Sequence, residues 1–357
     1  MPYSFNRRRF ITSASLATFG LGLTGASAGM YSSRKTSPVR TNAGPGDKAG
    51  LDGKRVGIIG LDTSHSIAFA KSLNGPTKDL DFAGYKVVAA YPYGSKDIKS
   101  SADRIPGYIE DAKKLDIAIK GSIEELLAEV DAVLLETNDG RLHLEQALPV
   151  LKAGKRLFID KPVAASLADA LAIFEASKKY KVPVFSSSSL RYTTGAQNIA
   201  QGKTVRKVLG ADTYSPCKLE SHHPDLFWYG VHGVELLFTV MGAGCRTVVR
   251  AHSDDTDLVM GIWEDHRIGT FRGLRSGKTD YGGTVFGDNG IVQTGSYDGY
   301  DSLLVRIIEF FSSGVAPVTA EETIEIYAFM EAADESKRRG GVPVSIDEVL
   351  TKARAKV

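Results

Sequence analysis

The chain has 357 residues, of which 43% are apolar and 24% charged, a composition typical of a soluble globular protein long enough for two domains. The net charge is only +2, from 44 basic and 42 acidic residues, which gives no bulk electrostatic case for nucleic acid or an anionic membrane as partner. Cys217 and Cys245 are too few for a disulfide framework, although they could pair in an oxidising compartment.

The N-terminus predicts export. Residues 7–11, Arg-Arg-Arg-Phe-Ile, resemble a twin-arginine export motif, and a weakly apolar run over residues 11–23 is too short to span a membrane. Small residues ending at Ala28 suit a signal peptidase. We therefore expect a signal peptide over residues 1–28, a flexible linker over residues 29–52, and a mature protein in the bacterial periplasm without a membrane anchor. An uncleaved N-terminal anchor is the alternative.

Apolar runs alternate with helical patterns over residues 53–186. This alternation predicts an α/β fold with a mostly parallel, doubly wound, Rossmann-like sheet. The first run, residues 55–60, ends in Gly60 and leads into a turn and a helix, as a nucleotide-binding βαβ unit does. Further strands are expected at residues 86–91, 131–136, 156–159 and 182–186, and helices at residues 122–130, 142–153 and 167–180.

One apolar strand ends at Ile159 and is followed by Asp160, Lys161 and Pro162. Proline lacks an N–H group, so strand pairing stops there and Lys161 stands at the carboxyl edge of the sheet, where open α/β sheets bind ligands. Desolvation can lower the pKa of such a lysine and suit it to proton transfer with a substrate hydroxyl. A salt-bridged surface lysine is the alternative.

The dinucleotide fingerprint Gly-x-Gly-x-x-Gly falls on Gly60, Asp62 and His65, so only its first glycine is present. Asp62 would place a negative charge beside a phosphate unless its side chain turns away to cap the helix. We expect Asp62, Thr63 or Ser64 to cap the first helical turn, which leaves backbone N–H groups available for an anion.

The second strand ends near Tyr91 without the acid that usually binds the ribose of NAD. Ser95 and Lys96 follow and could hold a 2′-phosphate, which is a hint of NADP. The residues leave NAD and NADP both open.

Several motifs in one order resemble the Gfo/Idh/MocA oxidoreductase family, which includes glucose-fructose oxidoreductase and inositol dehydrogenases. They comprise Asn138, His143, an Ala-Gly-Lys at residues 153–155, and Asp160 with Lys161, where the family has Glu-Lys-Pro. The resemblance implies that NAD or NADP is bound by Gly60, Asp62, Thr63, Ser64, His65, Tyr91, Asn138, His143, Asp160 and Lys161.

A second set of motifs lies downstream. Gly230 and His232 are similar to the family's Asp-x-Gly-x-His-x-x-Asp helix, with Trp228 and Glu235 in place of its acids, and residues 320–344 resemble its C-terminal helix and tail. The resemblance implies hydride transfer from a sugar or polyol to the nicotinamide, with Lys161 and His232 exchanging the hydroxyl proton and acting as catalytic residues.

The resemblance also implies that residues 187–357 form an α+β domain with an open, mostly antiparallel sheet that faces the substrate and a second subunit of a homo-oligomer. Short alternating runs over residues 248–293 agree, with hairpin signals at residues 264–266 and 288–290. The expected substrate-binding residues are Arg191, His223, Asp225 and Tyr229. Arg191 could instead brace the two domains, and His223 could be an ordinary loop residue.

A metal site formed by His222, Asp225, His232 and Glu235 is conceivable, but the spacing matches no standard site and no metal is expected.

Two other functions compete with the oxidoreductase prediction. A redox-neutral enzyme would hold NAD tightly and cleave or epimerise a sugar by oxidising and then re-reducing it. A carbohydrate-binding protein would have kept the fold and lost the cofactor, as Asp62, His65 and Tyr91 suggest.

Overall fold

The computed structural model describes residues 53–76, 80 and 82–357, so the predicted signal peptide and linker lie outside the described residues. Within this part of the chain, none of the helices combines the length and apolar character needed to cross a membrane. Cys217 and Cys245 are both buried free thiols and do not pair.

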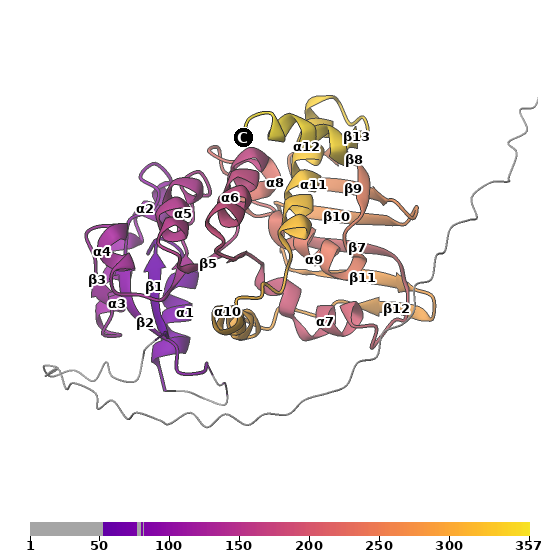
Figure 1. Cartoon of the computed structure of the whole chain (residues 1–357). Helices are drawn as coiled ribbons and strands as arrows, with labels where there is room; N and C mark the ends of the chain where they lie inside the picture. The colour runs from indigo at the N-terminus through magenta and orange to yellow at the C-terminus, as the bar shows by residue number, and fades with distance from the viewer. Residues whose placement is uncertain (1–52, 77–79, 81) are drawn as a thin grey trace, which may run out of the picture. The chain divides into compact units, whose positions relative to one another are not determined.

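The first sheet, as described, has six strands in the order β3-β2-β1-β4-β5-β6, and every neighbouring pair is parallel. The predicted doubly wound fold is thereby confirmed. Strands β1, β2, β3 and β5 of this sheet are labelled in Figure 1. The sequence analysis did not predict β3. The strands are β1 (Arg55–Ile59), β2 (Lys86–Tyr91), β3 (Ala118–Ile119), β4 (Ala132–Leu135), β5 (Arg156–Ile159) and β6 (Val184–Phe185).

The helices of this region include those that the sequence predicts, with one shorter than expected. The helix predicted over residues 122–130 ends at Leu127. Ser122 caps it by accepting a hydrogen bond from the Glu125 N–H at 3.1 Å, while the Glu125 carboxylate accepts one from the Gly121 N–H. The helices are α1 (Ser64–Asn74), α2 (Lys99–Ala102), α3 (Ile105–Lys113), α4 (Ile123–Leu127), α5 (His143–Lys152) and α6 (Leu167–Tyr180).

The central strands are buried on both faces. Along β4, Val133 and Leu135 belong to one hydrophobic cluster, while Ala132 and Leu134 belong to another. This division follows from the two-residue period of a strand, which sends successive side chains to opposite faces. Because both faces are covered, these strands read as continuous apolar runs rather than as alternating ones.

The second sheet has seven strands in the described residues, ordered β12-β11-β7-β10-β9-β8-β13. All neighbouring pairs are antiparallel except β7 and β10, which agrees with the predicted open, mostly antiparallel sheet. Both predicted hairpin turns are confirmed, between β9 and β10 and between β11 and β12. The strands are β7 (Val208–Pro216), β8 (Cys245–His252), β9 (Thr256–Trp263), β10 (Ile268–Leu274), β11 (Gly282–Gly287), β12 (Gly290–Gln293) and β13 (Val344–Ser345).

The sequence analysis began this sheet at Val248 and missed β7, which precedes the His232 helix in the chain and lies between β11 and β10. The remaining elements are the 3₁₀ helix η1 (Ser189–Tyr192) and the helices α7 (Thr194–Ala200), α8 (Asp225–Trp228), α9 (Val231–Met241), α10 (Asp301–Ser313), α11 (Ala320–Arg338) and α12 (Ile346–Arg354).

One hydrophobic cluster joins the two sheets. It runs from Val133 and Leu157 in the first sheet through α6, α9 and α11 to Val248 and Val259 in the second. Helix α9 carries this contact with no exposed residue along its length. The two sheets are therefore held in place by shared packing, because the same cluster of buried side chains contacts both of them.

Helix α10 packs against the opposite face of the first sheet, although it comes late in the chain. Leu304, Ile307 and Phe310 join the cluster that contains Leu134, and the Phe310 ring lies 5.7 Å from the ring of Phe185 in β6. The division at residue 186 stays a prediction, since an element from the second part of the chain completes the core of the first sheet.

If α10 is integral to that core, Phe310→Ala should lower the free energy of unfolding by about 3–5 kcal/mol, because it leaves a cavity beneath the sheet. Urea denaturation followed by circular dichroism measures this loss. Val315→Ala is the control, since Val315 is 71% exposed and its truncation should change stability by less than about 0.5 kcal/mol. Equal effects of the two substitutions would contradict the packing.

Candidate active site

Three neighbouring strands end at the same level of the first sheet. The register pairs Ile59 with Leu135 and Leu135 with Ile159. The residues that follow these three positions are Gly60, Glu136 and Asp160. Because parallel strands present their carboxyl ends at one edge, these residues and the loops after them form the wall of one site.

Gly60 makes the tight turn after β1. Its φ of +91° lies in the left-handed region, and a Cβ atom there would lie 2.5 Å from the backbone nitrogen of Thr137. Only glycine fits this position, which is the role of the first glycine of the fingerprint.

Asp62 is fully buried and turned away from the site, but it does not cap the helix. Its carboxylate accepts hydrogen bonds from the backbone N–H of Asn138 at 2.9 Å and of Ser95 at 3.3 Å, and so joins the loops after β4 and β2. Burial raises its pKa from 3.8 to about 6 despite these hydrogen bonds. The predicted conflict between Asp62 and a phosphate is therefore relieved by a different contact from the one expected.

Thr63 is the residue that caps α1, through a long hydrogen bond of 3.5 Å from the His65 N–H to its hydroxyl. Ser64 is exposed at the start of the helix. Thr63, Ser64 and Asn138 all line the same pocket. The helix N-terminus and these polar side chains provide N–H and O–H donors suited to an anion.

His65 pairs with Asp160 across the site. Its Nδ1 lies 2.7 Å from the Asp160 carboxylate, and both side chains are largely buried. Burial works to raise the pKa of Asp160, but the neighbouring His65 and Lys161 outweigh it and hold that pKa below its usual range. Asp160 is therefore held as a carboxylate at the end of β5.

Glu136 follows β4 and is completely buried. Neither of its carboxylate oxygens has a hydrogen-bond partner among the described residues. Burial and, to a smaller extent, the Asp160 carboxylate raise its pKa well above the ordinary value. The sequence analysis did not name Glu136 as a site residue, although an acid directly after a buried apolar strand could have drawn attention to it.

Lys161 and His232 lie in the same pocket, as predicted. The Lys161 ammonium lies 5.8 Å from the centroid of the Tyr229 ring, and the Tyr229 and His232 rings are 5.2 Å apart. Lys161 is 7% exposed and forms no ion pair in the described residues, so the alternative of a salt-bridged surface lysine is not supported.

His232 is held by a contact that the sequence analysis missed. Its Nδ1 lies 2.7 Å from the Ser188 hydroxyl, which also accepts a hydrogen bond from the Leu190 N–H. Burial, aided by Lys161, lowers the pKa of His232 well below its usual value. The ring is therefore neutral near pH 7. In the tautomer whose Nδ1 donates to Ser188, the other nitrogen keeps a lone pair that can accept a proton.

The pocket itself has a volume of about 490 Å³. Its lining includes Lys161, His65 and His232, and the exposed Arg104 and Lys218 form no ion pair in the described part of the chain. Aromatic rings lie among these polar groups, since the His65 ring is 4.6 Å from that of Tyr300. The aromatic residues lining it are Trp228, Tyr229, Tyr281, Tyr297 and Tyr300, and the sequence analysis named only Tyr229 as a site residue.

Three of the four predicted substrate residues lie away from this pocket. Arg191 is buried and forms ion pairs of 2.8 Å with both Glu235 and Glu322, so it braces η1 against α9 and α11. Asp225 pairs with Arg250 at 2.9 Å and with Lys337 at 2.6 Å. The charges of Arg191 and Asp225 are therefore used in ion pairs that stabilise the fold.

His223, the third, has a fully buried side chain and accepts a hydrogen bond from the Gly140 N–H at 3.1 Å. Burial lowers its pKa to about 4, which agrees with an unprotonated acceptor nitrogen. His143 is likewise buried, with ring nitrogens near the carbonyl oxygens of Thr137 and Val163. Both histidines contact the backbone of loops at the sheet edge, and neither lines the pocket.

A second hollow, of about 1,020 Å³, lies beside the end of β2 and is lined by Tyr91, Ser95, Lys96 and Arg141. The Ser95 hydroxyl is already bonded to Asp97 and the Ile98 N–H, so it is a poor ligand for a 2′-phosphate. Lys96 is exposed in this hollow.

Known proteins resemble this chain in sequence and in fold. Residues 54–188 match the Gfo/Idh/MocA family, described as an oxidoreductase family with an NAD-binding Rossmann fold. This region of the chain is therefore similar to the Gfo/Idh/MocA family over less than half of the chain's length. It contains every residue predicted to bind the cofactor.

A 1,5-anhydro-D-fructose reductase from Ensifer adhaerens is 33% identical over 141 residues, which are 38% of this chain and 39% of that protein. The chain thus matches about two fifths of the length of this curated relative.

Solved structures match over a longer span. A scyllo-inositol dehydrogenase from Lactobacillus casei with bound NAD(H) and scyllo-inositol has a TM-score of 0.66 at 14% identity, covering 82% of this chain and 99% of that one. A myo-inositol 2-dehydrogenase from Lactobacillus plantarum has a TM-score of 0.64 at 16% identity, covering 82% and 98%. At these identities the likeness shows the fold of both sheets.

The residues of the matched region, 54–188, fit a dinucleotide. Gly60 keeps the tight turn, Asp62 withdraws its charge from the pocket, and Thr63, Ser64 and Asn138 present polar groups at the start of α1. His65 occupies the place of the third glycine but lies against Asp160 at the pocket wall, so the edge of the sheet stays open.

The raised pKa of Asp62 predicts a pH-dependent stability. The folded protein holds this proton more tightly than the unfolded chain, so Asp62 costs stability as pH rises from 3.8 to about 6. Relative to Asp62→Asn, the wild type should lose about 3 kcal/mol of unfolding free energy between pH 3.5 and pH 7. Urea denaturation of both proteins at several pH values tests this, and a constant difference between them would contradict it.

Proposed function

We propose that the protein is an NAD(P)-dependent oxidoreductase that removes hydride from a carbon bearing a hydroxyl group in a sugar or polyol. The observation that carries the proposal is the pairing of Lys161 and His232 in one pocket that adjoins the start of α1. The Gfo/Idh/MocA match to residues 54–188 supports the cofactor. The relatives named as a sugar reductase and inositol dehydrogenases support the substrate class.

The dinucleotide, when bound, would supply the hydride acceptor, and Thr63, Ser64 and Asn138 would hold its phosphates. The aromatic residues of the pocket lining suit the apolar face of a sugar ring, with Tyr229 and Tyr281 joined through their hydroxyl groups at 3.1 Å. NAD and NADP remain alternatives, because Lys96 is exposed at the end of β2 while Ser95 is engaged elsewhere.

The proton of the substrate hydroxyl passes to this chain's own side chains. His232 is neutral and can accept it, while the Lys161 ammonium stabilises the negative charge that develops on the oxygen. Burial strengthens these interactions, since Lys161 and His232 are at most 7% exposed and little water can screen them.

The protein is further proposed to work in the periplasm and as a homo-oligomer. The twin-arginine-like residues 7–11 support export, and the open face of the second sheet exposes Tyr214, Leu258 and Phe286, each 37% accessible. Cell fractionation and sedimentation velocity test the two proposals. A cytoplasmic protein would refute the first, and a monomer at micromolar concentration the second.

The decisive experiment is to purify the protein without added cofactor, denature it, and identify any released dinucleotide by mass spectrometry. One equivalent of NAD or NADP, or saturable binding on titration, is expected. Absence of both would refute the oxidoreductase proposal and favour a binding protein. Retained dinucleotide with product formed but no net change in nicotinamide absorbance would favour a redox-neutral enzyme.

Lys161→Ala should lower kcat by about 10²–10⁴-fold while dinucleotide binding is kept, because it removes the charge beside the reacting oxygen. Steady-state kinetics on a panel of sugars and polyols, with cofactor titration, measure both quantities. Lys203→Ala, at an exposed position outside the pocket, should leave them unchanged. Wild-type turnover in Lys161→Ala would exclude the proposed role.

A further inference from the structure

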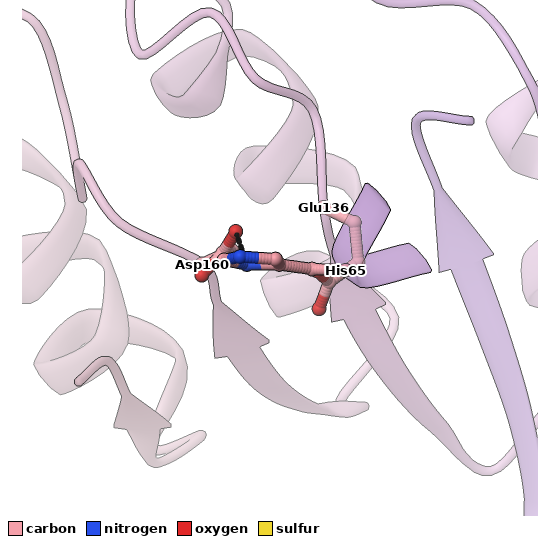
Figure 2. A group of neighbouring side chains, drawn as sticks. All are labelled: His65, Glu136 and Asp160. Carbon is pink, nitrogen blue, oxygen red and sulfur yellow. Dashed lines mark hydrogen bonds and ion pairs between the residues drawn. The ribbon is translucent and has the colours of Figure 1, made fainter. Parts of the chain in front are cut away.

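Three potential metal ligands from separate elements meet at the carboxyl edge of the first sheet. His65 comes from the first turn of α1, Glu136 follows β4 and Asp160 follows β5 (Figure 2). One ligand atom from each lies within 4.8 Å of the others. In the described residues no other group of three such side chains meets in this way.

Glu136 is the member of this cluster whose carboxylate oxygens have no hydrogen-bond partner in the described residues. It is also 0% exposed. A buried carboxyl group without a partner is strongly unfavourable, so native structures pair such groups or bind an ion there.

The neighbouring Lys161 and His65 do not fill this role. The Lys161 ammonium lies over the Tyr229 ring and makes no ion pair in the region that the structure describes. The His65 Nδ1 is engaged with Asp160 at 2.7 Å. Both oxygens of Glu136 therefore remain available to a ligand.

We infer that His65, Glu136 and Asp160 bind one divalent transition-metal ion. One imidazole nitrogen and two carboxylates form a mixed donor set that suits Mn²⁺ or Zn²⁺, because magnesium and calcium favour oxygen ligands alone. Two carboxylates balance the charge of the ion, and this balance removes the cost of burying Glu136 without a partner.

The cluster lies beside the pocket, so a bound ion could act on the substrate. This part of the inference rests on the proposed function. His65 and Lys161 both line the 490 Å³ pocket, so an ion held by the cluster can complete its coordination with an oxygen from that side. A hydroxyl oxygen of the substrate bound there would be polarised and would lose its proton more readily, to His232 or to water.

Metal binding is tested on the full chain, without dinucleotide or substrate. The protein is treated with a chelator, dialysed and titrated with MnCl₂ or ZnCl₂, and bound metal is measured by electron paramagnetic resonance for Mn²⁺ and by mass spectrometry for Zn²⁺. About one equivalent per chain is expected, together with a rise in melting temperature. Failure of both ions to bind at up to millimolar concentration would overturn the inference and leave Glu136 neutralised by a proton.

Glu136→Gln keeps the shape of the side chain and removes its charge, and should weaken metal binding by about tenfold or more. The metal-free variant should melt no lower than the metal-free wild type, because its amide carries no buried charge. Glu264→Gln, an exposed acid paired with Arg246, is the control and should bind metal as the wild type does. Undiminished binding by Glu136→Gln would place the ion elsewhere and refute the assignment.

The two proposals fail separately. If the protein binds metal but no dinucleotide, the oxidoreductase proposal fails and the metal-site proposal stands. If it releases NAD but binds neither ion, the oxidoreductase proposal stands and the metal-site proposal fails.

Discussion

The parallel register of β1, β4 and β5 is the constraint on which the site depends. Its ladder continues one residue beyond the strands, from the Glu136 N–H to the Ile59 carbonyl and from the Asp160 N–H to the Leu135 carbonyl. Glu136 and Asp160 therefore cannot move apart without loss of backbone hydrogen bonds in the core of the sheet. The loops that follow inherit this placement, and with it the position of Lys161 beside the pocket.

That edge gathers charge in a place with little water. Asp160, Glu136 and Lys161 are each at most 7% exposed, and His65 stands against them. In such surroundings burial and neighbouring charges raise the pKa of Glu136 and lower that of Asp160. Buried carboxyl groups with shifted pKa values can bind either a proton or a cation. The proposed hydride transfer from an alcohol and the proposed metal binding both use this ability.

The second half of the chain supplies the opposite wall and fixes it rigidly. His232 lies in the first turn of α9, and this helix is tied to η1 and α11 through Arg191, which lies between Glu235 and Glu322. Charges that a linear sequence offers as substrate ligands are thus used to orient the helix that carries the proposed proton acceptor. Removal of one partner would leave buried charge unpaired, so these residues affect the site through its geometry.

The alternation of strands and helices in the first sheet, the turn at Gly60 and the placement of Lys161 at a strand end were determined by the sequence, although β3 and β7 were missed. Each depends on local period, backbone freedom or the missing N–H of proline. Motif order likewise indicated His232. Only the tertiary structure decided that Asp62 joins two loops, that Arg191 forms ion pairs with Glu235 and Glu322, and that Glu136 has no hydrogen-bond partner among the described residues. Those outcomes depend on which distant segments pack together, and no local pattern of residues records the contacts between them.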